Sequence, residues 1–187
     1  MTDNELWLVR HGATEWSLAG KHTSTTDLPL LAEGEESARS LGPRLAPESF
    51  ALVLTSPRQR ARRTAELAGF PGAVVDEDLA EWGYGLYEGV TSDVIREQVP
   101  DWTIWTHPCP GGETPDQVSA RLDRVLVRAR EVQGDVLLFG HGHALRALAA
   151  RWLGLPVTEG RLLRLDTASV SVLGHEREVA VVLRWNS

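Results

Sequence analysis

The chain contains one cysteine, one lysine and no long apolar run, and each shortage excludes a class of protein. Because Cys109 is the single cysteine, no disulfide can form within the chain, and no cysteine–histidine group has zinc-site spacing. No segment approaches the roughly 20 apolar residues that a membrane-spanning helix requires. The first five residues are acidic and lack the apolar stretch of a signal peptide. We therefore expect a cytoplasmic protein with no membrane partner and no metal site.

The net charge of −7 also argues against a nucleic-acid partner. A length of 187 residues with 42% hydrophobic residues predicts one globular domain over 1–187, large enough to bury a core without covalent cross-links. The oligomeric state stays open, with a homodimer among the options. Within this acidic chain, positive charge is concentrated at a few positions.

Three short apolar runs, each followed by residues that suit a phosphate group, predict a ligand site. The runs are 6–9, 52–54 and 136–139. Arg10 and His11 follow the first, Arg60 follows the second after a short interval, and His141 follows the third. If the runs are parallel strands, these side chains meet at the carboxyl edge of the sheet, where ligands bind in open α/β folds. An arginine binds phosphate bidentately and an imidazole can attack it.

The intervals between the runs leave room for crossover helices, so we predict a three-layer α/β/α fold with a mostly parallel central sheet. Helices are expected over 33–46, 56–68, from 114 onward and over 142–153, with a short helical turn at 14–16. Ser56 is expected to cap the second helix, and Thr114 with Gln117 forms a capping box. The segments 170–173 and 179–183 predict a terminal hairpin at the sheet edge.

Residues 76–113 are rich in glycine, proline, acidic and aromatic residues and show only weak periodicity. A long stretch of this kind inside a compact domain is usually functional or disordered, and the aromatic content argues against disorder. We interpret it as a small cap inserted over the ligand site, with short helices near 91–98 and 101–106. A purely structural excursion is the alternative.

A histidine that accepts a phosphoryl group must be unprotonated, and neighbouring cations such as Arg10 and Arg60 lower its pKa. The Gly142 amide, at a helix N-terminus, would add a donor to the phosphate. The leaving alcohol needs a proton, for which the cap offers Glu81, Glu88 and Glu113. Trp82 beside Glu81 predicts an apolar setting that suits an acid catalyst, and this favours Glu81 only narrowly over Glu88.

Five motifs in this order, LVRHGATEWS, SPRQRARRTA, LAEWGYGLYEG, PGGET and FGHGHALR, closely resemble the histidine phosphatase superfamily, also called phosphoglycerate mutase-like. They span nearly the whole chain, and the cap motifs look like those of an actinobacterial acid-phosphatase subgroup. The resemblance implies that His11 is the nucleophile and forms a phosphohistidine, with Glu81 as proton donor. It also implies that Arg10, Arg60 and His141 form the phosphate pocket. Arg58, Arg62 and Arg63 are then solvated helix residues.

Further positions of the resemblance often contact phosphate or substrate: Thr14, Ser17, Thr23 and Gly142. Ser17 stands where the family usually has Asn, and His22 with Thr23 replaces its usual Gln-Gly. His22 either faces the substrate or is a surface histidine, and His143 is a further candidate for a substrate contact. Tyr84 of the cap is another. His107 and His175 are expected at the surface.

The sequence thus predicts a phosphatase that hydrolyses phosphate monoesters of a small metabolite or an aryl alcohol, with no cofactor and no metal ion. An acidic pH optimum is expected because Glu81 must begin the reaction protonated. Arg96 is the only Arg or Lys between Trp82 and Ala120, so the cap lacks the arginine pair of the cofactor-dependent mutases. The cap tryptophans suggest an apolar or aromatic leaving group. The alternatives are a phosphoglycerate mutase, a sugar-bisphosphate phosphatase and a non-catalytic phosphate-binding protein.

Overall fold

The computed structural model describes residues 4–187 and contains a sheet of mixed direction. Its strands are β1 (Leu6–Arg10), β2 (Phe50–Thr55), β3 (Val74–Val75), β4 (Asp135–Gly140), β5 (Val170–Glu176) and β6 (Val179–Arg184). The order across the sheet is β3-β2-β4-β1-β5-β6. Strands β3, β2, β4 and β1 are parallel, whereas β5 runs antiparallel to β1 and pairs with β6 as a hairpin. The mostly parallel sheet and the terminal hairpin are confirmed.

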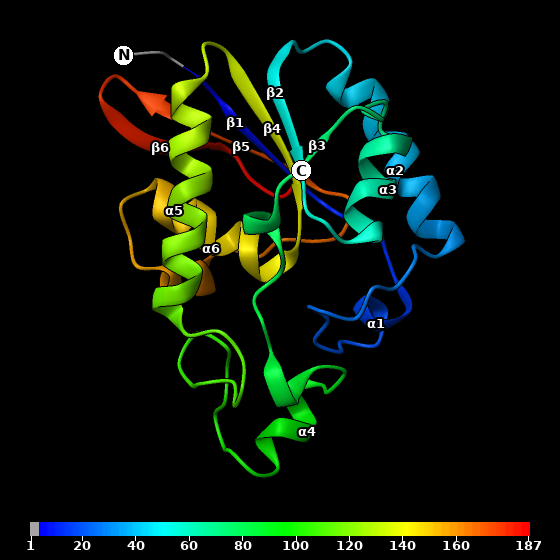
Figure 1. Ribbon diagram of the computed structural model, residues 1–187, viewed down its shortest axis with the longest axis vertical. Helices are drawn as coiled ribbons and strands as arrows, with labels where there is room; N and C mark the ends of the chain where they lie inside the picture. Colours follow the sequence, from blue (N-terminus) through cyan, green and yellow to red (C-terminus); the bar gives the residue numbers. More distant parts are fainter. Residues whose placement is uncertain (1–3) are drawn as a thin grey trace.

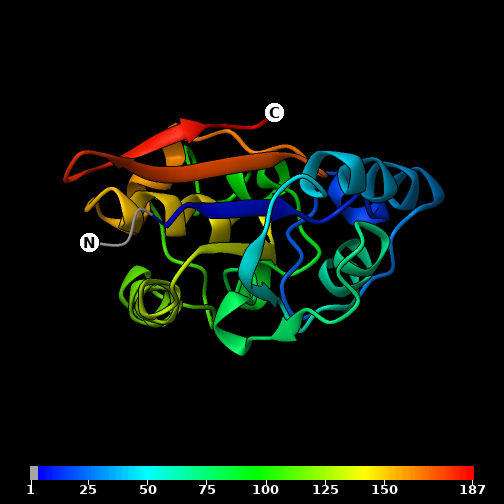
Figure 2. The same ribbon diagram turned by 90° about the horizontal axis from the view of Figure 1, so that it is seen from above.

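Helices cover both faces of this sheet. They are α1 (Glu15–Leu18), α2 (Ala32–Leu45), α3 (Gln59–Leu67), α4 (Ser92–Arg96), α5 (Pro115–Glu131) and α6 (Gly142–Trp152). Three short 3-10 turns, η1 (Glu77–Leu79), η2 (Gly85–Tyr87) and η3 (Val157–Leu162), were not anticipated. In both views α5 and α6 lie together, apart from α2 and α3 (Figure 1 and Figure 2). No helix within residues 4–187 is long and apolar enough to cross a membrane.

The apolar run of β1 is continuous because both faces of the sheet are covered. Leu6 and Leu8 belong to the core shared with α5, α6 and the segment 76–113. Trp7 and Val9 point to the other face and join the core shared with α2 and α3. A strand with this pattern is fixed in the centre of the sheet, and its carboxyl end delivers Arg10 and His11 to one edge.

One helix begins as predicted from the sequence, and another does not. Thr114 and Gln117 form the predicted capping box of α5. The prediction that Ser56 caps α3 is wrong, because α3 begins at Gln59 and Arg58 occupies the cap position. The Ser56 hydroxyl instead forms a 2.6 Å hydrogen bond with Nε2 of His141, which draws it toward the strand end rather than the helix.

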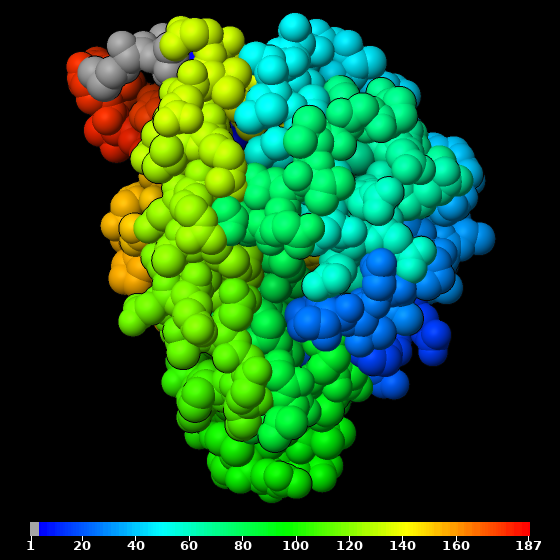
Figure 3. All heavy atoms as spheres, in the orientation of Figure 1, coloured from blue at the N-terminus to red at the C-terminus, as the bar shows by residue number. Residues whose placement is uncertain are grey.

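Residues 76–113, here called the cap segment, extend beyond one end of the sheet on the side of α1 (Figure 1). The surface view shows the chain around α1 lying against it (Figure 3). An isolated bridge pairs Lys21 with Thr91, and the Trp16 ring packs closely on Gly89. Helix α4 confirms one of the two predicted short helices. The helix expected over 101–106 is absent: Asp101 has a φ of +61°, which a right-handed helix does not allow, and residues 104–106 form only a turn.

Candidate active site

A cavity of about 230 Å³ lies where β1 and β4 end. Most predicted site residues line it: Arg10, His11, Thr14, Ser17, His22, Thr23, Glu81, Tyr84, Gly142 and His143. Five further lining residues were not predicted from the sequence: Gly20, Lys21, Ser92, Arg146 and Leu165. Arg60 and His141 are fully buried and lie behind the cavity wall.

His11 is held by the loop that follows β1. Its Nδ1 lies 2.7 Å from the Gly12 carbonyl oxygen, so Nδ1–H donates there and the neutral ring keeps a free lone pair on Nε2. Among residues 4–187, Nε2 has no hydrogen-bond partner, and it is not enclosed by protein atoms. Since His11 lines the cavity, Nε2 faces it. The Gly12 N–H donates to the Thr64 hydroxyl at 3.0 Å, which fixes the loop to α3.

This loop also rests directly on the backbone of α2. A Cβ atom on Gly12 would lie 2.3 Å from the carbonyl oxygen of Gly34, and a Cβ on Gly34 would lie 2.2 Å from that of Ala13. Real Cβ atoms do not approach backbone oxygens so closely. Two glycines therefore allow the loop that carries His11 to sit against the start of α2.

Three basic side chains surround the His11 ring. Arg10 donates from Nη1 to the Leu165 carbonyl at 2.5 Å. Arg60 donates from its two Nη atoms to the carbonyls of Thr26 and Thr23 at 3.0 and 3.1 Å. The His141 ring centroid lies 5.2 Å from that of His11, edge to face. The structure thus brings together the four residues that follow the three predicted strands.

This environment keeps both histidines neutral. Burial, Arg60 and Arg10 hold the pKa of His11 well below its ordinary value. Burial, Arg60 and His11 do the same for the pKa of His141. The neighbouring arginines lower the pKa of His11 as expected, with burial as the larger cause.

Glu81 lies across the cavity from β1, and its setting is polar rather than apolar as expected. Its carboxylate accepts hydrogen bonds from the backbone N–H groups of Trp82 at 2.9 Å, Ala144 at 2.7 Å and His143 at 3.0 Å. Two of these donors belong to the first turn of α6, where the helix dipole favours an acceptor. The carboxylate is therefore fixed beside the N-terminus of α6, and its residue is 7% exposed.

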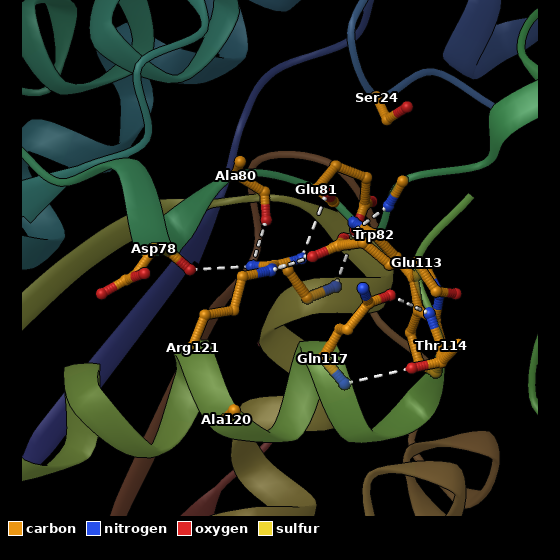
Figure 4. A network of polar contacts seen from close by, with 12 residues as sticks. Ser24, Asp78, Ala80, Glu81, Trp82, Glu113, Thr114, Gln117, Ala120 and Arg121 are labelled. Atoms are coloured by element: carbon orange, nitrogen blue, oxygen red, sulfur yellow. Dashed lines mark hydrogen bonds and ion pairs between the residues drawn. The ribbon is translucent and has the colours of Figure 1, made fainter. Parts of the chain in front are cut away.

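Arg121 of α5 holds the backbone that carries Glu81 (Figure 4). Its Nη atoms donate to three carbonyl oxygens, those of Asp78, Ala80 and Glu81, at 2.7, 2.8 and 3.2 Å. Its Nε donates to the Glu113 carboxylate at 2.7 Å, and Glu113 in turn accepts from the Gly83 N–H at 2.7 Å. Glu113, a weaker candidate for the proton donor, is thus occupied by an ion pair.

Glu88, the nearest rival of Glu81, binds protein groups outside the cavity. It accepts hydrogen bonds from the Ser24 N–H and hydroxyl at 2.9 and 2.5 Å and from the Thr26 N–H at 2.9 Å. Burial acts to raise its pKa, but these hydrogen bonds prevail and hold it below the ordinary value. Glu88 therefore anchors the loop whose carbonyls, at Thr23 and Thr26, hold the guanidinium of Arg60.

The wall away from His11 is polar, which corrects the expectation of an apolar leaving-group site. The tryptophans Trp82, Trp102 and Trp105 are buried in the core and do not line the cavity. Their side chains pack in the apolar core that the cap segment shares with α5 and α6. The wall is built instead from Lys21, His22, Tyr84, His143 and Arg146.

With this geometry in view, comparison with known proteins assigns the family. The model of the histidine phosphatase superfamily (branch 1) matches residues 6–187. The chain belongs to this superfamily. An acid phosphatase of Mycobacterium tuberculosis is 42% identical over 96% of this chain and 92% of its own. A sedoheptulose 1,7-bisphosphatase of Saccharomyces cerevisiae is 39% identical over 80% and 68%.

Solved structures agree with this assignment. The structure of an open reading frame from Mycobacterium tuberculosis is 40% identical and covers 98% of this chain and 97% of its own, with a TM-score of 0.94. The resemblance inferred from the five motifs, including the likeness to an actinobacterial acid phosphatase, is confirmed, as is the phosphoglycerate mutase-like fold.

The remaining superfamily positions show how local structure uses their side chains. Thr14 and Ser17 cap α1 reciprocally, so both hydroxyls are partly engaged where they line the cavity. The Thr23 hydroxyl donates to the Lys21 carbonyl at 3.1 Å. His22 is 7% exposed, so the surface alternative for it is wrong.

Among the arginines of SPRQRARRTA, Arg62 and Arg63 are exposed as expected. Arg58 is half-buried, which corrects the prediction of a solvated side chain, because it precedes α3 rather than lying on the helix surface. His175 is exposed as expected, and His107 is half-buried. In the part of the chain that the structure describes, no three His, Cys, Asp or Glu side chains are grouped to hold a metal ion.

Proposed function

We propose that this superfamily member hydrolyses phosphate monoesters through a phosphohistidine at His11, without a metal ion. The orientation of the His11 ring carries the proposal. Its Nδ1–H is bound to the Gly12 carbonyl and its free Nε2 faces the cavity, as a nucleophile requires.

Two steps account for the reaction. In the first, Nε2 of His11 attacks phosphorus, the ester P–O bond breaks, and Glu81 gives its proton to the leaving oxygen. In the second, Glu81 takes a proton from water, the resulting hydroxide attacks phosphorus, the P–N bond breaks and inorganic phosphate leaves. Arg10 and the N–H of Gly142 are the groups that would balance charge on the phosphoryl oxygens.

The arginines beside His11 support a phosphate as ligand. The Nε atom of Arg10, which lines the cavity, is buried and makes no hydrogen bond within residues 4–187. Buried donors are rarely left without a partner. A phosphoryl group at the His11 Nε2 would bring oxygen acceptors to this cationic cluster.

The proposal includes an acidic optimum. The low pKa of His11 lets the ring remain a nucleophile in mildly acidic solution, where an ordinary histidine would be protonated. The leaving oxygen must receive a proton from an acid, so activity should fall as the pH rises.

A sugar-bisphosphate phosphatase is the second candidate, because positive charge reaches the cavity from outside the cap. Lys21 and Arg146 both line it, although the cap segment lacks an arginine pair. A second anionic group on the substrate could bind there. The name of the yeast relative, a sedoheptulose 1,7-bisphosphatase, is consistent with this alternative.

The experiment is a phosphate-release assay with p-nitrophenyl phosphate at mildly acidic pH in the presence of EDTA, followed by trapping of the phosphoenzyme. We expect turnover, an acid-labile phosphate on His11, and loss of both in His11→Ala but not in the exposed control His175→Ala. Loss of all turnover to EDTA would contradict the metal-free mechanism. Binding of phosphate esters without release would favour a non-catalytic protein, and interconversion of phosphoglycerates would favour a mutase.

A further inference from the structure

Two imidazole rings besides that of His11 line the cavity. His22 comes from the loop after α1, and His143 from the first turn of α6. Their rings are stacked with centroids 6.1 Å apart and planes 15° from parallel. The proposed chemistry uses neither ring.

The hydrogen bond of His22 fixes its tautomer. Its Nδ1 lies 2.7 Å from the Val90 carbonyl oxygen, which can only accept, so Nδ1 carries the proton. Burial lowers the pKa of His22, which favours the neutral ring. Its Nε2 is therefore a hydrogen-bond acceptor.

Tyr84 fixes the opposite tautomer in His143. The Tyr84 hydroxyl lies 2.6 Å from Nδ1 of His143. A phenol is the stronger acid and an imidazole the stronger base, so the hydroxyl donates and Nδ1 accepts. Burial raises the pKa of Tyr84 and lowers that of His143, which keeps both groups neutral. Nε2 of His143 therefore carries the proton and is a donor.

Neither Nε2 atom has a hydrogen-bond partner in the described part of the chain, and neither is sealed off by protein. Because both rings line the cavity, it presents an acceptor and a donor on two rings whose centroids lie 6.1 Å apart. A hydroxyl group donates and accepts at once, and it is the simplest group that matches both. Alkyl and unsubstituted aryl groups offer neither function.

We propose that His22 and His143 together recognise a hydroxyl group of the leaving alcohol, so that the preferred substrates are phosphate esters of polyols or sugars. The inference rests on the proposed phosphatase function and specifies its substrate class. The polar side chains of Lys21, Ser92 and Arg146 on the same cavity suit a hydroxylated chain. A volume of about 230 Å³ accommodates a phosphoryl group and a short chain of this kind.

The test compares two esters of equal chain length, glycerol 3-phosphate and n-propyl phosphate, by their kcat/KM values in wild type and variants. The amide of asparagine lies near the position of the histidine Nδ1. His22→Asn and His143→Asn therefore keep the hydrogen bonds to Val90 and Tyr84 but remove Nε2. Each variant should lower the preference for the glycerol ester about tenfold, the effect of one lost hydrogen bond. The ratio between variant and wild type cancels the intrinsic difference in reactivity of the two esters.

Glutamine places its amide near the position of Nε2, so His22→Gln and His143→Gln should recover part of the preference. The exposed His175→Asn is the matched control and should leave the preference unchanged. Equal loss of activity toward both esters in the Asn variants, or a wild-type preference that they leave intact, would overturn the inference while the phosphatase function stands. Failure of the wild type to release phosphate from any ester would overturn both.

Discussion

Arg121 offers the sharpest test of how α5 supports the candidate acid. Replacing it by leucine removes the donor to three carbonyl oxygens, those of Asp78, Ala80 and Glu81, and leaves the Glu113 carboxylate without its cation. Arg121 is 8% exposed, so water reaches the orphaned groups poorly. We expect the Glu81 backbone to lose its fixed position and the fold to lose stability.

The magnitude follows from the burial of the pair. Removing one partner of a buried ion pair costs about 3–5 kcal/mol, and the partial exposure of Glu113 places Arg121→Leu near the lower end. For a domain of this size each kcal/mol lowers Tm by about 2–4 °C, so a loss of about 3 kcal/mol predicts a fall of roughly 6–12 °C.

Thermal unfolding followed by circular dichroism measures this change, with Arg124→Leu as control. Arg124 lies on the same helix and pairs with Asp78, but its side chain is 58% exposed, so its loss should leave Tm nearly unchanged. At a temperature where the Arg121→Leu variant is folded, its hydrolysis of alkyl phosphates should be slowed more than its hydrolysis of p-nitrophenyl phosphate, because the p-nitrophenolate leaving group needs less protonation. Equal Tm values for the two variants would refute the supporting role of Arg121, and equal slowing of both esters would refute its link to Glu81.

Three further predictions concern the chemistry and the phosphate side of the cavity. Glu81→Ala should reduce kcat with alkyl phosphates by about 10²–10⁴-fold, which is the usual contribution of general acid–base catalysis. The loss of kcat with p-nitrophenyl phosphate should be much smaller. A similar loss with both esters would assign the proton to another group. Glu88→Gln should loosen the loop that holds Arg60 and so raise the inhibition constant of inorganic phosphate, measured as a competitive inhibitor. An unchanged inhibition constant would show that Glu88 does not support the phosphate site. Arg60→Met should raise the pKa of His11, because the Arg60 guanidinium lowers it. The acidic limb of the plot of kcat/KM against pH should then move to higher pH. An acidic limb that stays in place would show that another group titrates there.

The strand ends could be predicted from the sequence because a strand covered on both faces leaves a continuous apolar run with an abrupt polar end. Val136–Phe139 and Leu6–Val9 are such runs, and Gly140 and Arg10 pair across β4 and β1 in the structure. Arg10, His11 and His141 could therefore be assigned to one edge before any coordinates. The family motifs then separated Arg60 from its neighbouring arginines.

Features that depend on contacts between distant segments could not be predicted. Ser56 has the sequence of a helix cap, but its hydroxyl binds His141, 85 positions later. Trp102 and Trp105 look like a lid over a ligand, yet they belong to the apolar core that the cap segment shares with α5 and α6. Arg121 gives no signal in the sequence, because an arginine on an amphipathic helix usually faces solvent.

The contact between Gly12 and Gly34 determines how this enzyme would respond to random substitution. Gly34 carries no functional group and belongs to α2, but every other amino acid there would push a Cβ atom into the backbone of Ala13. In a saturation screen scored by activity, position 34 should be as intolerant as position 11. A map of sensitive positions would thus mark as catalytic a residue whose whole contribution is to leave space unfilled.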